Sequence, residues 1–152
     1  MSCEVETQSN PDPQEAAEST IAFETIDYTQ FTPKVSNIPS TVELGVDVAF
    51  ELDSFTLVSG YDPLFVDTIN GWGDRLYVFD SKNELIYKSR GVGDPYLYEP
   101  HFYRNDANDK TIIICQLAFE YYFGGDVFLF ENGKINYIGN IGVDGDDTET
   151  RL

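Results

Sequence analysis

The stretch VELGVDVAFELD, from Val42 to Asp53, decides the fold class. Apolar side chains occupy every second position in it, and acidic or small residues occupy the positions between them. A repeat of two residues is the period of a β-strand with one buried face. After Asp53-Ser54 the apolar phase moves to Phe55 and Leu57, so a bulge or a turn must bring both sets to the same core. The stretch therefore predicts a half-buried strand followed by a change of direction.

Two later segments predict β-hairpins. In each, an apolar strand runs into a polar turn and an Ile- or Leu-containing return strand with a tyrosine. The first comprises residues 75–79 and 84–88, and the second comprises residues 127–130 and 135–138. Asn132-Gly133, in the second turn, is among the strongest short-range hairpin signals.

The two hairpins also resemble each other. Gly73-Asp74 precedes the first and Gly125-Asp126 precedes the second, at a spacing of about 50 residues that is typical of β-repeat units. The pattern is similar to the inner strands of a β-propeller blade, but two units are too few to close a ring. What the resemblance implies is a meander of antiparallel strands, in two related halves.

Two neighbouring segments between the hairpins are rich in apolar residues. Residues 111–119 form the most apolar run of the chain and predict a central strand covered on both faces, with a helix as the competing interpretation. Residues 96–104 are aromatic but contain Pro100, which predicts an edge strand or an ordered loop. Tyr61-Asp-Pro63 is a loop signal.

These signals predict an all-β domain, an antiparallel meander or sandwich of about seven to nine strands with two similar hairpins. We expect the domain to span residues 21–142, with 21–39 as an extended segment laid against it. Residues 1–20 are too polar and acidic to form a core and predict a flexible, disordered tether. Residues 143–152 predict an acidic frayed tail.

The charge of the chain restricts its partners. The formal net charge is −18, from 27 acidic against 9 basic residues, so nucleic acid and anionic membranes should repel it. No Lys or Arg precedes Lys34. The expected partner is a protein, peptide or glycan, and a basic protein surface would be attracted.

The cysteines carry opposite expectations. Cys115 lies in an apolar run and predicts a buried, inert thiol. Ser2-Cys3, followed by a polar acidic stretch, resembles the start of a mature bacterial lipoprotein, in which a leader precedes the lipid-modified cysteine. That resemblance implies lipidation at Cys3 and a place in the cell envelope. The alternative is an incidental cysteine in a cytoplasmic protein.

Motifs for catalysis and metal binding are scarce. His101 is the only histidine, and we find no nucleophile elbow, phosphate-binding glycine loop or paired-cysteine motif. The sequence therefore predicts no catalytic residue and no cofactor, and it favours a protein that is not an enzyme. Asp144, Asp146 and Asp147 around Gly145 are candidate Ca²⁺ ligands, against the interpretation of an acidic tail.

Candidate ligand-binding residues come from two aromatic segments. Rings alternate with His101, Arg104 and Glu99 in the strip 96–104, which could stack against a sugar or a peptide. The competing interpretation is core packing of alternate rings. Trp72 lies between two glycines and is either an exposed contact residue or a loop anchor. The candidates are Trp72, Tyr96, Tyr98, His101, Tyr103 and Arg104.

Three functions follow from these observations. The first is a non-enzymatic binding or interaction domain on a tether. The second is an acidic intracellular inhibitor or immunity-type protein that covers a basic site on its target. The third is a hydrolase that uses paired carboxylates.

Overall fold

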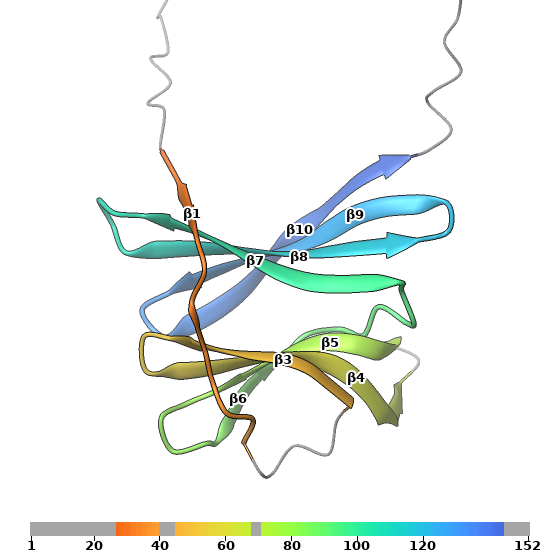
Figure 1. Cartoon of the computed structure of the whole chain (residues 1–152), viewed down its shortest axis with the longest axis horizontal. Helices are drawn as coiled ribbons and strands as arrows, with labels where there is room; N and C mark the ends of the chain where they lie inside the picture. The colour runs from red at the N-terminus through yellow and green to blue at the C-terminus, as the bar shows by residue number, and fades with distance from the viewer. Residues whose placement is uncertain (1–26, 40–44, 68–70, 145–152) are drawn as a thin grey trace, which may run out of the picture.

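The chain forms a sandwich of two antiparallel sheets (Figure 1). The computed structural model describes residues 27–39, 45–67 and 71–144, with the backbone alone at 46–47, 63–67 and 143–144. These residues contain ten strands and no helix. Sheet A holds, in spatial order, β1 (Thr29–Phe31), β7 (Leu97–Asn105), β8 (Lys110–Phe119), β9 (Tyr122–Glu131) and β10 (Lys134–Asp144). Sheet B holds β2 (Lys34–Val35), β3 (Gly45–Leu52), β4 (Phe55–Asp67), β5 (Gly71–Phe79) and β6 (Leu85–Lys88).

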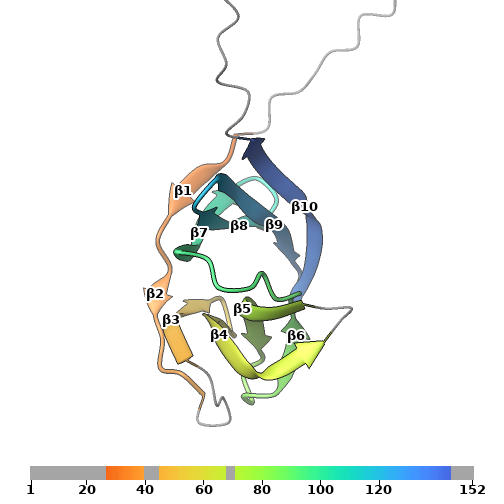
Figure 2. The ribbon, with the colours of Figure 1, turned by 90° about the vertical axis from the view of Figure 1, so that its right-hand side faces the viewer.

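The predicted all-β class is confirmed, and the strand number exceeds the expected range because the N-terminal segment contributes two short strands. β1 pairs with β7 in sheet A, and β2 pairs with β3 in sheet B. Pro33 lies between the two short strands, so its missing N–H removes no hydrogen bond from either sheet. The segment passes from one sheet to the other along the side of the sandwich (Figure 2). Within residues 27–39, the expectation of an extended segment against the domain is confirmed.

Each sheet is a four-stranded meander to which one short N-terminal strand is added. Sheet B uses β3 to β6 in sequence order, and sheet A uses β7 to β10. The two predicted hairpins are β5–β6 and β9–β10, and they occupy the same place in their respective sheets. Asn132 and Gly133 both have positive φ, at 51° and 69°, as the tight turn of the second hairpin requires. The expected change of direction after Leu52 is a two-residue turn, in which Asp53 has φ 56°.

The main core lies between the sheets. Phe102, Ile113 and Phe128 from sheet A meet Leu57 and Leu76 from sheet B, together with the other buried residues of the cluster. A smaller buried cluster, Ala49, Val58, Tyr77 and Phe79, lies on the other face of sheet B.

Two expectations for sheet A need correction. β8 is central, as predicted, but it is covered on one face only, because burial alternates and Ile112 and Ile114 stay partly exposed while Cys115 is fully buried. β7 is an edge strand only in its first half. β1 pairs with it from Phe102 to Arg104, whereas Pro100 lies beyond that pairing, where its missing N–H costs no ladder bond.

The predicted loop at Tyr61-Asp-Pro63 is wrong. β4 continues through it to Asp67, and the sequence signal corresponds instead to a break in register with β5 between Asp62 and Asp67. A proline is tolerated at such an irregularity because the ladder bond is already lost there.

Candidate functional site

An open cleft of about 590 Å³ lies at one end of the sandwich, between the two sheets. We call this end, which carries the Glu120-Tyr121 turn and the loop 89–96, the cleft end. The opposite end carries the turns that join β3 to β4, β5 to β6, β7 to β8 and β9 to β10, and it is called the hairpin end. Sheet A contributes Leu117, Phe119, Tyr122, Tyr137 and Asn140 to the cleft lining. The other wall is Gly71, Trp72 and the loop residues Arg90 to Gly93.

The cleft stands over a buried aspartate. Asp126 belongs to β9, where it shares the inward phase of Phe128 and Phe130, and it is fully buried. Three cleft residues converge on its Oδ1 atom. Arg90 Nη2 donates at 2.7 Å, Asn140 Nδ2 at 3.1 Å and the Tyr137 hydroxyl at 3.4 Å.

The hydrogen-bond network extends from Asp126 to the cleft surface. The Tyr122 hydroxyl donates to Asn140 Oδ1 at 2.5 Å, so the orientation of the Asn140 amide is fixed from both sides. The Arg90 guanidinium also lies over the Tyr137 ring, 5.6 Å from its centroid. These contacts hold the donors of the cleft in place before any ligand arrives.

One atom of this network has no partner. Asp126 Oδ2 is buried and accepts no hydrogen bond from any described residue. A buried carboxylate oxygen without a donor is costly, and a functional role is one of the explanations for such an atom. Because the Arg90 side chain is half exposed, its remaining donors face the cleft.

The wall around Trp72 depends on glycine. Gly73 and Gly93 have φ of 87° and 84°, and the two residues form a parallel bridge. Gly93 N donates to Trp72 O at 2.6 Å, and Asp74 N donates to Gly93 O at 2.8 Å. A Cβ on Gly73 would lie 1.8 Å from Gly93 O, so no other residue allows the chains to approach this closely. Tyr61 packs edge-on against the Trp72 indole.

Arg90 and the tyrosines Tyr137 and Tyr87 have pKa values raised above their ordinary values. The hydrogen bond to Asp126 raises the pKa of Arg90, and burial raises the pKa of Tyr137 and of neighbouring Tyr87. Among the described residues, no resolved shift brings a pKa toward neutrality. The cleft therefore offers fixed hydrogen-bond donors and aromatic faces.

A second buried polar pair lies below the cleft floor. Burial raises the pKa of the Cys115 thiol to about 12 and that of the Tyr98 hydroxyl well above its ordinary value. Cys115 is a free thiol, so the prediction of a buried cysteine is confirmed. At such a pKa it remains protonated, which makes it a poor nucleophile.

The structure separates the predicted site residues. Trp72 lines the cleft, and Tyr96 lies at the same end of the molecule, largely exposed. Tyr98 is buried in the core. His101 and Tyr103 are partly buried and lie in the opposite phase of β7 from Tyr98.

Arg104 lies at the hairpin end, far from the cleft in the fold. It donates to Asp53 at 3.2 Å and lies over the Phe31 ring. The aromatic strip is thus not one surface, because alternate residues of a strand point to opposite faces. For Tyr98 and Phe102, core packing is the correct interpretation.

Sequence reasoning missed Arg90, Asp126, Tyr137 and Asn140. A signal for Asp126 was present, since its position shares the inward phase of Phe128 and Phe130 in the second hairpin. A buried aspartate needs hydrogen-bond donors, so this position predicts that a cationic or amide side chain lies beside it.

The remaining predicted sites lie outside the described side chains. These are Cys3 and the candidate Ca²⁺ ligands Asp144, Asp146 and Asp147. Within the residues that the structure does describe, no three His, Cys, Asp or Glu side chains gather to hold a metal ion. The same residues include no helix of a length and apolarity that could cross a membrane.

Comparisons of the chain with protein-family models, with curated proteins and with solved structures gave no match. By its fold the protein is a two-sheet β-sandwich, with a cleft lined by aromatic and polar side chains between its sheets.

Proposed function

We propose that this protein is a non-enzymatic binding domain that holds an uncharged saccharide in the cleft between its sheets. The observation that carries the proposal is the group of polar side chains fixed on buried Asp126 beside exposed aromatic rings. Such a combination of apolar walls with a few positioned polar groups is typical of small-molecule sites.

The chemistry of a sugar matches both parts of the cleft. One face of a pyranose ring carries C–H groups, which pack on an aromatic face such as that of Trp72 or Tyr122. Its hydroxyls both donate and accept, so they can pair with the Arg90 guanidinium and the Asn140 amide. Because Arg90 is already paired with Asp126, the local charge is balanced and the strongly acidic chain would repel a free anion.

The sole tryptophan gives a direct test, because Trp72 lines the cleft. A glycan array would identify uncharged saccharides that bind, and titration of a retained glycan should change the Trp72 emission. Calorimetry on Trp72→Ala and Asn140→Ala should show affinities at least about tenfold weaker, as expected when a stacking ring or a positioned polar group is lost.

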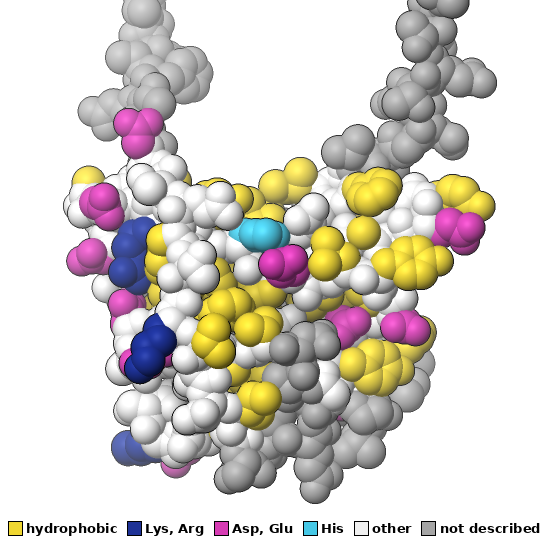
Figure 3. All heavy atoms as spheres, viewed as in Figure 1, with side chains coloured by type: hydrophobic (Ala, Val, Ile, Leu, Met, Phe, Trp, Pro, Cys, Tyr) yellow, Lys and Arg dark blue, Asp and Glu magenta, His cyan; other side chains and the backbone are white. Residues whose placement is uncertain are grey.

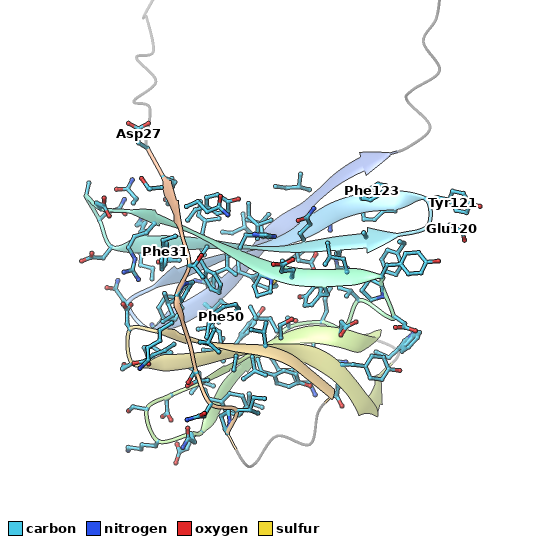
Figure 4. All side chains as sticks on the ribbon, in the orientation of Figure 1. Asp27, Phe31, Phe50, Glu120, Tyr121 and Phe123 are labelled. Carbon is cyan, nitrogen blue, oxygen red and sulfur yellow. The ribbon has the colours of Figure 1, made fainter. Side chains whose placement is uncertain are left out.

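Phe123→Ala is the matched control, because Phe123 is an exposed ring on the adjacent β9 position and belongs to the opposite face of sheet A (Figure 4). It should bind like the unmodified chain. A glycan that binds all three variants equally, or an array on which no uncharged glycan is retained, would rule the proposal out.

The envelope-anchored and inhibitor interpretations remain hypotheses beside it. Palmitate labelling at Cys3, in a chain expressed with a lipoprotein leader, tests the anchor. Salt dependence tests the inhibitor, because binding driven by net charge weakens steeply with ionic strength, whereas stacking in the cleft does not.

A further inference from the structure

We propose that the cleft end carries a second binding surface, which receives a Lys- or Arg-containing segment of a partner protein. Four side chains define it, Asp94, Tyr96, Glu120 and Tyr121, and we call them the aromatic-acidic tip. They line a hollow of about 560 Å³ that shares Phe119 and Tyr122 with the cleft. This surface is independent of the saccharide proposal.

The exposure of the two tyrosines is the first observation. Tyr96 is 79% exposed and Tyr121 is 82% exposed, at the start of β7 and in the turn between β8 and β9. Tyr96 N donates to Ala118 O at 2.8 Å, and the turn that carries Tyr121 is closed by the paired residues Phe119 and Tyr122. Large aromatic side chains presented on a rigid frame are enriched at protein interfaces, since they bury much area at little cost in conformational entropy.

The carboxylates beside these rings identify the chemistry of the partner. Asp94 and Glu120 are exposed, and within the described residues neither takes part in a hydrogen bond or an ion pair. An ammonium or guanidinium group between two rings and two carboxylates gains both cation–π attraction and ion pairing. A peptide rather than a free small cation fits the tip, because both rings are largely exposed and a peptide can cover their apolar area as well as pair with the carboxylates.

The distribution of charge along the sandwich supports the same partner. Lys34, Lys82, Arg104, Lys110 and Lys134 all lie at the hairpin end. In Figure 3 the dark blue side chains lie at their end, together with acidic ones, whereas the opposite end shows hydrophobic and acidic side chains and no dark blue ones in this view. Among the described residues, the lining of the tip hollow includes Asp94 and Glu120 but no Lys or Arg, so an approaching basic segment meets only negative charge there.

The test uses a labelled heptapeptide in which three lysines alternate with glycines, measured by fluorescence anisotropy at physiological salt. Tyr96→Ala with Tyr121→Ala removes the rings and leaves the net charge unchanged, and it should weaken binding about tenfold. Asp94→Asn with Glu120→Gln removes two charges and leaves the shape, and it should weaken binding by a similar factor.

The matched control is Asp106→Asn with Asp109→Asn, which removes two exposed charges at the hairpin end. It should change the affinity less than twofold, and Trp72→Ala, which changes no side chain of the tip, should also leave it unchanged. Equal losses from both charge pairs, no effect of the tyrosine pair, or no binding of the lysine peptide would each overturn the proposal.

A measurement on the unmodified chain keeps the test independent of variant folding. Tetranitromethane nitrates exposed tyrosines, and mass spectrometry locates the modified residues. The lysine peptide should protect Tyr96 and Tyr121 but leave Tyr103 unprotected, whereas a peptide with glutamine in place of lysine should protect none of them. Equal nitration of Tyr96 and Tyr121 with and without the lysine peptide would contradict a docking surface at the tip.

Discussion

The two ends of the sandwich differ in the burial of their ion pairs, and they also differ in how much space surrounds their glycines. At the hairpin end the ion pairs lie at the surface, as in Lys34 with Glu51 and Arg104 with Asp53. At the cleft end the carboxylate of Asp126 is fully buried and its partners line a cavity. Exposed ion pairs such as those of the hairpin end contribute little to stability. At the cleft end, by contrast, burying the Asp126 carboxylate costs desolvation free energy that its hydrogen bonds must offset.

The largest loss of stability should come from replacing a glycine in the wall of the cleft. Gly73→Ala places a Cβ 1.8 Å from the Gly93 carbonyl oxygen, where only backbone movement can relieve the contact, at a φ of 87°. We expect the free energy of unfolding to fall by about 4 kcal/mol or more, measured by urea denaturation.

At the hairpin end, Gly133→Ala should cost only about 1–2 kcal/mol, because the new Cβ meets the tip of the Phe55 ring, which can move. Gly139→Ala, with no neighbour within 4 Å of the added Cβ, is the neutral control. If Gly73→Ala unfolds no more easily than Gly133→Ala, the close approach that forms the cleft wall is not a rigid feature.

The next largest loss of stability should come at alkaline pH, through the buried Cys115 thiol and Tyr98 hydroxyl. The pKa of Cys115 is 9.0 for a free thiol and about 12 in the folded chain, because burial disfavours the thiolate. Above about pH 9 the unfolded chain loses this proton and the folded chain keeps it, so stability falls as pH rises toward the folded value.

Cys115 alone should remove about 3 kcal/mol from the free energy of unfolding by about pH 11, and buried Tyr98 adds to the loss in the same direction. The measurement is urea denaturation across this range in a Cys3→Ser background. Cys115→Ala should flatten the pH dependence, and an unchanged slope in that variant would show that the thiol is not the group that titrates.

The fold could be predicted further than the site. The alternation over Gly45 to Leu52 and the Asn132-Gly133 turn are local signals, and each corresponds to a strand or a turn in the structure. Pairing within a meander follows chain order, so local hairpins were enough to predict antiparallel sheets.

The cleft could not be found in this way, because it forms where Trp72, Arg90 and Tyr137 meet from distant parts of the chain. Periodicity shows which face of a strand is buried but not which strand of the other sheet lies opposite. The aromatic strip misled for a related reason, since sequence proximity within β7 places Tyr98 and Tyr103 on opposite faces.

The two Arg–Asp pairs allow a direct measurement of what burial contributes. Asp126 is 0% exposed and Asp53 is 58% exposed, measured for the side chains, and each accepts a hydrogen bond from an arginine. Asp126→Asn keeps the shape but removes the charge that three donors share, and we expect a loss of about 2 kcal/mol in unfolding free energy.

Asp53→Asn should cost less than about 0.5 kcal/mol, because an exposed pair contributes little and asparagine tolerates the positive φ at this turn position. Urea denaturation of the two variants at the same pH checks both values. Equal losses would mean that the burial of Asp126 does not set the strength of its hydrogen bonds.

The smallest effect should come from Lys110, whose ammonium lies 3.3 Å from Glu131 across neighbouring strands at the hairpin end. Both side chains are about one-third exposed, so water and salt screen the attraction and the flexible lysine loses entropy when it is held. Lys110→Gln should change the unfolding free energy by less than about 0.5 kcal/mol, and high salt should reduce even this difference. A loss above about 1 kcal/mol that persisted in high salt would show that the hairpin end also holds its charges in a cooperative network, and the contrast between the two ends would then rest on the cleft alone.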